Sequence, residues 1–184
     1  MTWQERARAV QLVVLDVDGV MTDGGVYWGV IDGRPVELKR FEVTDGLGVH
    51  LLRRAGLDVA IVTGRPSPLV RLRAEELGVA ECHEAPGGFK LPVVDTLRAR
   101  RGLGWGAVAV LADDLADVPL LRRAGLAAAV ANAVPEVRAA AHWIGRRRGG
   151  EGAVREFAEA LLRAQGRWGS AVAAYLAERE AGRP

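Results

Sequence analysis

Four short apolar runs, separated by amphipathic segments, set narrow limits on how this chain can fold. Each run is rich in β-branched or small residues and is apolar on both faces, which is typical of central strands in a covered parallel sheet. The runs occupy residues 10–15, 59–62, 107–111 and 126–131. The intervening spacing and glycine stops predict helices over residues 45–55, 67–77, 91–101 and 117–124. This alternation predicts an α/β fold with a doubly wound, Rossmann-like, mostly parallel sheet.

A hairpin is expected directly after the first strand. Residues 26–28 and 36–41 flank Asp32-Gly33, a pair that favours tight hairpin turns. We therefore predict a projecting β-hairpin over about residues 24–41. An exposed aromatic side chain on such a projection, Trp28, favours an interface.

The remaining segments fit one domain without a cap. An amphipathic helix is predicted over residues 153–165, and residues 166–184 form a tail that is either one more helix or a mobile segment. A length of 184 residues suits a single domain, with its core at about residues 8–165. The gaps between the strand ends are too short to hold a cap domain.

Composition excludes several classes of protein. The net charge is only +2, and the basic run at residues 146–148 is short enough to be a solvated turn, so we expect no nucleic-acid partner. The single cysteine, Cys82, rules out an internal disulfide and is expected to be a buried structural residue. No apolar run is long enough for a membrane span. We expect a soluble, cytoplasmic protein.

Two aspartates follow the first predicted strand at a spacing that brings them to one face. Asp16 and Asp18 are two residues apart at the strand's carboxyl end, where open parallel sheets bind their ligands. Neighbouring buried carboxylates repel unless a cation compensates them, and carboxylate oxygens favour Mg²⁺. The alternative is an Asp-Gly turn with a helix cap.

Three further elements carry matching chemistry. Asp113-Asp114 follows the third run and can meet the first pair in space, although it could also simply cap a helix; Asp117 lies one helical turn later. The second run ends in Thr63-Gly64-Arg65, where a hydroxyl and backbone N–H groups open a helix and can cradle a phosphate. Lys90 begins another helix and could neutralise a phosphoryl oxygen, unless it is ordinary surface charge.

The order DxDG, TGR, Lys and DDxxD resembles the four motifs of the haloacid dehalogenase (HAD) superfamily, from residue 10 to about residue 117. The sequence around these motifs is similar to that of 3-deoxy-D-manno-octulosonate 8-phosphate (KDO 8-phosphate) phosphatases over roughly residues 10–165, for example in the segments LDVDGVMTDG and GGEGAVREF. This resemblance implies a HAD-type fold and a phosphomonoester hydrolase.

The resemblance also implies roles for the acidic residues. Asp16 would attack phosphorus and form an aspartyl-phosphate, and Asp18 would serve as general acid and then general base. Mg²⁺ would be held by Asp16, the backbone carbonyl of Asp18, and Asp113.

Further roles are implied around the phosphate. Thr63 would donate to the phosphoryl group, while Lys90 would balance its charge and be oriented by Asp117 or Asp114. Substrate contacts would come from Arg65, Gly64 and Asp45, although Arg65 could equally form a structural salt bridge.

Several positions depart from the family pattern. Ala112 replaces a glycine, the loop at residues 84–90 is one residue longer, and Asn132 stands where an aspartate is common. Glu151 stands where a basic residue is frequent, and its charge would repel an anionic sugar acid if it faced the site. These departures affect substrate assignment more than the catalytic carboxylates.

A site without a cap domain is open to water, which suits poorly a small substrate that needs desolvation. The phosphatases that this chain resembles form tetramers, in which the hairpin and the C-terminal tail of neighbouring subunits help to cover the site. We therefore expect a homotetramer that hydrolyses KDO 8-phosphate. Two alternatives stay open: a phosphatase for a sialic-acid-type 9-phosphate, and a catalytically silent HAD oligomerisation module. A third class, nucleic-acid binding, would require steeply salt-dependent affinity.

Overall fold

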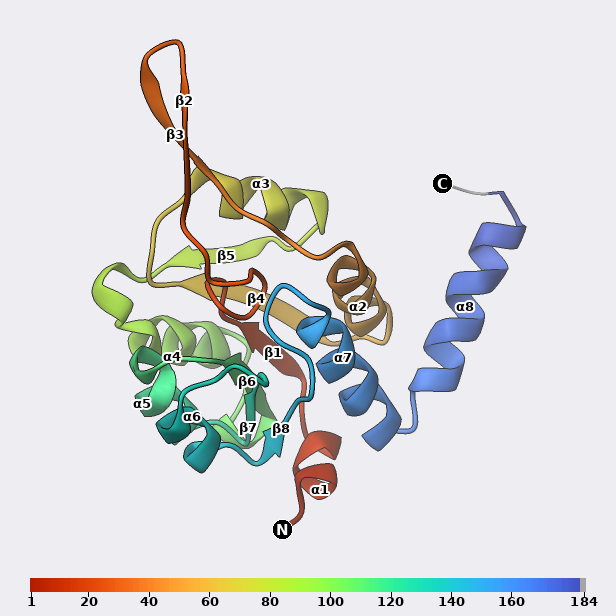
Figure 1. Ribbon diagram of the computed structural model, residues 1–184. Coiled ribbons are helices and arrows are strands. Elements are labelled where there is room, and N and C mark those ends of the chain that lie inside the picture. Colours follow the sequence, from red (N-terminus) through yellow and green to blue (C-terminus); the bar gives the residue numbers. More distant parts are fainter. Residues whose placement is uncertain (183–184) are drawn as a thin grey trace.

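A computed structural model describes residues 1–182, and its centre is a six-stranded parallel sheet of order β5-β4-β1-β6-β7-β8 (Figure 1). The strands are β1 (Leu12–Leu15), β4 (Asp58–Thr63), β5 (Glu81–Glu84), β6 (Val108–Ala112), β7 (Leu126–Ala129) and β8 (Trp143–Ile144). All residues of β1, β6 and β7 are buried, as their apolar sequences predict. The predicted doubly wound α/β fold is therefore confirmed.

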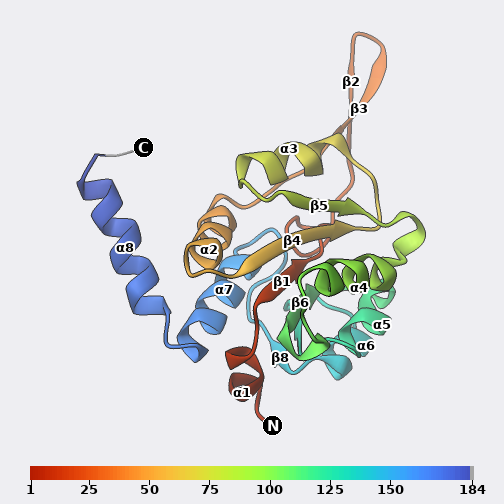
Figure 2. The same ribbon diagram turned by 180° about the vertical axis from the view of Figure 1, so that it is seen from behind.

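Helices cover both faces of the sheet. On one face α2 (Val43–Arg54) packs along α7 (Ala153–Ala164), and α1 (Trp3–Arg8) packs beside α7. The opposite face is covered by α4 (Lys90–Arg100), α5 (Val118–Leu121) and α6 (Pro135–Ala140) (Figures 1 and 2). The remaining core helix, α3 (Pro68–Glu76), lies beside β5, and short 3₁₀ turns occupy Pro86–Gly88, Trp105–Ala107 and Leu115–Asp117.

The expected hairpin projects from the sheet edge as β2 (Tyr27–Ile31) and β3 (Arg34–Leu38). Its turn places Asp32 at φ 50° and Gly33 at φ 73°, the left-handed pair that an Asp-Gly turn provides. An isolated antiparallel bridge between Thr22 and Phe41 closes its base. No second domain is inserted between the strand ends within residues 1–182.

The C-terminal segment forms α8 (Trp168–Glu180), so the described part of the predicted tail is a helix. It stands away from the sheet in Figure 1 and contacts α2 through the rings of His50 and Tyr175, 5.9 Å apart, and an Arg54–Glu178 ion pair. Residues 183–184 of that tail lie outside the described residues. No helix within residues 1–182 is both long enough and apolar enough to cross a membrane.

Local pattern alone missed four elements: α1, α6, β5 and β8. The strand β5 reads Glu-Cys-His-Glu and is half-buried at the sheet edge, so it lacks the apolar run that marks a central strand. Cys82 on this strand is accordingly half-buried rather than fully buried, and that burial raises the pKa of its thiol. The predicted helix over residues 117–124 is shorter: a 3₁₀ turn takes up Asp117 at its start, and α5 already ends at Leu121, where a turn follows.

The register of the central strands fixes where the site forms. Leu15 at the end of β1 is paired with Ile61 of β4 and Leu111 of β6, and all three strands run in the same direction. The segments that follow these strands therefore emerge together at one edge of the sheet.

Candidate active site

The first two aspartates leave β1 in different environments. The backbone N–H of Asp16 donates to Leu111 at 3.2 Å, which extends the sheet pairing by one residue and buries Asp16 to 8% exposure. Asp18 lies beyond the strand, and its side chain is 33% exposed. One carboxylate is thus fixed inside the site while the other meets solvent.

Three carboxylates converge at this edge of the sheet. Asp16, Asp113 and Asp117 each present an oxygen within 4.8 Å of the others. Burial, reinforced by the charge of Asp16, raises the pKa of Asp113 to about 8 and that of Asp117 to about 7. The three carboxylates therefore repel one another when ionised, and a nearby cation would stabilise them.

Lys90 supplies part of that charge. The first residue of α4 extends its Nζ to 2.6 Å from Asp16 Oδ1 and 2.9 Å from Asp117 Oδ1. Burial lowers the pKa of Lys90, but Asp16 and Asp117 outweigh this effect and the net pKa is raised. Of the two partners considered for Lys90, the structure selects Asp117, while the Asp114 side chain accepts the backbone N–H of Leu115 at 2.7 Å.

The turn after β4 has a different arrangement from the one expected. Thr63 is 1% exposed, and its hydroxyl donates to the Arg65 carbonyl at 3.1 Å and accepts the Arg65 N–H at 3.2 Å. It would have to release this carbonyl to donate to a phosphoryl group. Gly64 and Arg65 do line the cleft, and Arg65 also forms an ion pair with Glu37 at 2.9 Å.

Asp45 does not lie in this cluster. It is 4% exposed between α2 and α7, and its Oδ1 accepts the backbone N–H of Arg155 at 2.7 Å. Burial raises the pKa of Asp45 to about 6. Asp45 thus packs α2 against α7 and lies outside the residues that line the cleft, so its expected substrate contact stays a prediction.

The loop after Asp18 is held tightly against the other elements. Gly19 has φ +82°, and a Cβ there would lie 2.0 Å from Asp113 Oδ2, so only glycine permits this approach. Asn132 Nδ2 donates to the Gly19 carbonyl at 3.1 Å, and its Oδ1 accepts the Gly149 N–H at 2.7 Å. Asn132 therefore clamps this loop, a role that its position in the sequence does not reveal.

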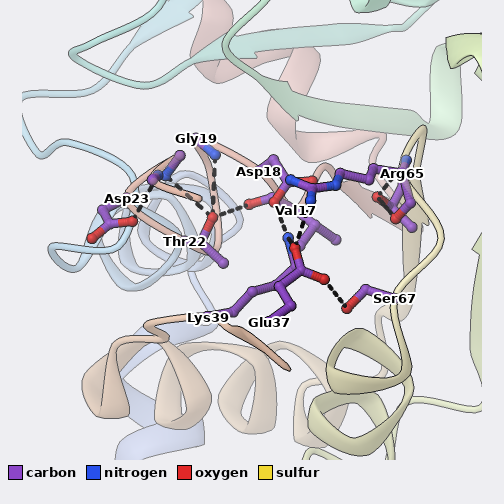
Figure 3. A network of polar contacts seen from close by, with 12 residues as sticks. Val17, Asp18, Gly19, Thr22, Asp23, Glu37, Lys39, Arg65 and Ser67 are labelled. Atoms are coloured by element: carbon purple, nitrogen blue, oxygen red, sulfur yellow. Dashed lines mark hydrogen bonds and ion pairs between the residues drawn. The ribbon is translucent and has the colours of Figure 1, made fainter. Parts of the chain in front are cut away.

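Two residues of the hairpin also reach the site without having been identified from sequence. Lys39 forms an ion pair with Asp18, and Glu37 pairs with Arg65 (Figure 3). Their alternation on β3 and just beyond it, two residues apart, is a weak signal that many solvated strands share.

The assembled residues surround an open cleft of about 290 Å³. Its lining combines carboxylates, one buried cation, glycines and Arg65: Asp16, Asp18, Gly19, Gly24, Gly64, Arg65, Gly88, Lys90, Asp113, Asp114, Ala116 and Asp117. Glu151 is absent from this lining and instead borders a separate groove with Arg146 and Arg147. Its charge therefore does not oppose an anion in the cleft of the single chain.

The donor set fits a hard divalent cation. Asp113 Oδ1 is buried and has no hydrogen-bond partner among the described residues, although a buried carboxylate oxygen without a partner is costly. Oxygen ligands from several carboxylates suit Mg²⁺ and similar ions. The Ala112 substitution leaves this convergence of carboxylates in place.

Comparison with known proteins agrees with this geometry. Residues 85–156 match the model of the haloacid dehalogenase-like hydrolases. The 3-deoxy-D-manno-octulosonate 8-phosphate phosphatase of Yersinia pestis is 40% identical over 161 residues, which cover 88% of this chain and 84% of that protein. The chain belongs to the KDO 8-phosphate phosphatase family of HAD hydrolases.

Solved structures of this phosphatase family share the fold. The enzyme from Moraxella catarrhalis, in complex with magnesium ion, phosphate ion and KDO, is 34% identical, with a TM-score of 0.88 over 94% of this chain and 97% of that chain. The cobalt-bound enzyme from Haemophilus influenzae is 32% identical, with a TM-score of 0.81 over 89% and 93% of the two chains. Both relatives thus hold divalent cations.

Proposed function

We propose that this phosphatase-family chain hydrolyses KDO 8-phosphate to KDO and phosphate in a Mg²⁺-dependent reaction, with Asp16 as nucleophile. The observation that carries the proposal is the buried Asp16 carboxylate, which faces an open cleft between Lys90 and the carboxylate of Asp113. The relatives from Yersinia pestis and Moraxella catarrhalis support the substrate.

Asp16, Asp113 and the backbone carbonyl of Asp18 would hold the metal ion. When bound, Mg²⁺ would screen the negative charge of the phosphate and its nucleophile. Asp117 stays paired with Lys90, so that its charge is compensated by the protein itself. This division leaves Asp113 Oδ1, which has no hydrogen-bond partner among the described residues, to serve as a ligand.

The first chemical step would form a bond between an Asp16 oxygen and phosphorus while the bond from phosphorus to the sugar oxygen breaks. Asp18 would donate a proton to that departing oxygen, so the sugar leaves as an alcohol. Lys90 would keep the nucleophile oriented and offset the charge that gathers in the buried site.

The second step would return the enzyme to its starting state. Asp18, now deprotonated, would accept a proton from water, and the water oxygen would attack phosphorus of the aspartyl-phosphate. The Asp16–phosphorus bond then breaks and inorganic phosphate leaves. Backbone N–H groups at Gly64 and Arg65, together with the Arg65 side chain, would contact the phosphate in both steps; Thr63 would join them only after releasing the Arg65 carbonyl.

A steady-state substrate panel with Mg²⁺ tests the proposal. We expect the highest kcat/KM for KDO 8-phosphate, above a nine-carbon sugar-acid 9-phosphate and simple hexose phosphates. Asp16→Asn should lower kcat by at least about 10³-fold, since the amide cannot act as the nucleophile. Equal phosphate release by both proteins would support a silent module, while preference for the 9-phosphate would revise the substrate alone.

We also propose a homotetramer located in the cytoplasm. The hairpin exposes Trp28 (66%), Val30 (73%) and Ile31 (61%), and such a cluster of apolar side chains favours association. Sedimentation velocity should give about four times the 19.7 kDa chain mass. Trp28→Lys should shift the protein toward smaller species, and a wild-type monomer would refute the tetramer without affecting the proposed chemistry.

A further inference from the structure

The base of the hairpin places a buried cation, the side chain of Lys39, against the carboxylate of Asp18. Lys39 follows β3 directly, and its side chain is 1% exposed although most of the hairpin faces solvent. Its Nζ donates to the Asp18 carboxylate, as Figure 3 shows. A lysine this deeply buried requires charged partners, and Asp18 is the nearest one.

A second carboxylate holds Lys39 in place from the other side. Glu37 Oε1 lies 3.7 Å from Lys39 Nζ and 2.9 Å from an Nη atom of Arg65, and Ser67 Oγ is 3.4 Å from Glu37 Oε2. The chain Asp18–Lys39–Glu37–Arg65 therefore links the two loops that line the cleft through one strand of the hairpin (Figure 3).

The hairpin does not need this ion pair for its attachment. The Thr22–Phe41 bridge closes its base, and Arg40 donates to the Gly150 carbonyl at 2.7 Å. Asp18, in contrast, is one-third exposed, and an exposed aspartate samples several rotamers unless a partner selects one. The ion pair therefore constrains Asp18 more than it constrains the backbone.

We infer that Lys39 is a positioning residue, which holds the Asp18 carboxyl group by Oδ1 and leaves Oδ2 to carry the proton for the oxygen that leaves phosphorus. This inference rests on the proposed role of Asp18 as general acid. Groups that transfer protons must be held close to their target, and a support that locks the rotamer contributes through that geometry without touching substrate. The hairpin thereby becomes part of the catalytic apparatus as well as a projecting surface.

The leaving group separates positioning from general structural damage. KDO 8-phosphate releases an alkoxide, which needs a proton from Asp18, whereas 4-nitrophenyl phosphate releases a stable phenolate that needs little help. Hydrolysis of the aspartyl-phosphate is common to both substrates, so the comparison uses kcat/KM, which reports the steps up to formation of that intermediate. Lys39→Met should lower kcat/KM for KDO 8-phosphate by about 10²-fold, and kcat/KM for 4-nitrophenyl phosphate by less than roughly threefold.

Matched variants complete the experiment. Lys39→Arg retains a cation and should recover most of the lost kcat/KM for KDO 8-phosphate. Arg34→Met removes an exposed cation from β3, the strand that Lys39 follows, and should behave as wild type on both substrates. If Lys39→Met does not fold by circular dichroism, Lys39→Gln serves instead, because it removes the charge but keeps a polar side chain, and it should give the same selective loss at smaller size.

Asp18→Asn distinguishes failure of this inference from failure of the proposed function. If Asp18→Asn lowers kcat/KM for KDO 8-phosphate no more than kcat/KM for 4-nitrophenyl phosphate, its role as general acid is wrong and the inference falls with it. If Asp18→Asn is selective but the Lys39 variant lowers both activities equally, or neither, the positioning role alone is overturned.

Discussion

Lys90 Nζ lies 2.6 Å from Asp16 Oδ1, and both side chains are at least nine-tenths buried. The same ammonium group reaches Asp117 at 2.9 Å, so one cation serves two carboxylates that come from different strand ends. Removing either partner of a buried ion pair destabilises the folded state, because the remaining charge is left buried without compensation. We therefore expect the stability and the activity of the site to be coupled through Lys90.

Removal of the Lys90 cation should reduce activity, and combining it with removal of the Asp117 charge should reveal the energetic coupling between the two residues. We expect Lys90→Met to lower kcat by about 10²-fold or more, since an electrostatic contact at the reacting centre is lost. In urea unfolding, Lys90→Met combined with Asp117→Asn should be more stable than the sum of the single effects predicts, by about 1–3 kcal/mol. Strict additivity would contradict the direct pairing.

Metal binding should stabilise the folded chain through Asp113. At a Mg²⁺ concentration of 100 times Kd, the folded state gains about 2.7 kcal/mol, which corresponds to a Tm increase of about 5–10 °C for a chain of this size. Asp113→Asn should abolish the increase in differential scanning calorimetry. Asp114→Asn is the matched control, because Asp114 caps a turn, and it should retain the increase.

The affinity for Mg²⁺ should rise with pH. Without metal, the pKa of Asp113 is about 8 and that of Asp117 about 7, so protons compete with the ion at neutral pH. We expect Kd to fall between pH 6 and pH 8, by up to about tenfold per pH unit for one displaced proton, and to level off above pH 8. Calorimetric titrations in buffers of different ionisation enthalpy measure both Kd and the number of protons released when Mg²⁺ binds. A constant Kd over this pH range would refute the competition between protons and Mg²⁺.

Asp45 should make stability depend on pH in the opposite sense from a salt-bridged carboxylate. Its folded pKa of about 6 lies above its usual value of 3.8, so the folded state binds the proton more tightly and loses stability as pH rises between these values. Relative to wild type, Asp45→Asn should gain up to about 3 kcal/mol between pH 4 and pH 7. Guanidinium unfolding of both proteins at pH 4 and pH 7 measures the difference in their free energies of unfolding. The same difference at the two pH values would contradict the proposed effect of Asp45.

Gly19 should be sensitive for a reason that backbone conformation alone does not provide. Gly19→Ala introduces a Cβ 2.0 Å from Asp113 Oδ2, while Gly33→Ala, at a φ of +73° against +82° for Gly19, meets no atom within 4 Å. Both variants should lose about 1–2 kcal/mol from the left-handed backbone. Only Gly19→Ala should also lose the Mg²⁺-dependent Tm increase; retention of that increase would argue against the tight approach.

The sequence alone located the central strands, the hairpin turn and the main carboxylates. A parallel sheet brings the carboxyl ends of β1, β4 and β6 to one edge, so local apolar runs followed by Asp16, Gly64 and Asp113 were sufficient to predict their convergence. Elements with mixed character, such as β5, were missed because their burial depends on neighbours rather than on their own pattern.

Only the tertiary structure decided which side chains meet. It paired Lys90 with Asp117 rather than Asp114, moved Asp45 into the contact between α2 and α7, and brought Lys39 from the hairpin to Asp18. The physical reason is that backbone periodicity is local, whereas ion pairs join segments whose distance is set by how helices and loops pack. Residue spacing therefore determined the edge of the sheet where the site forms, and packing determined its charge pairs.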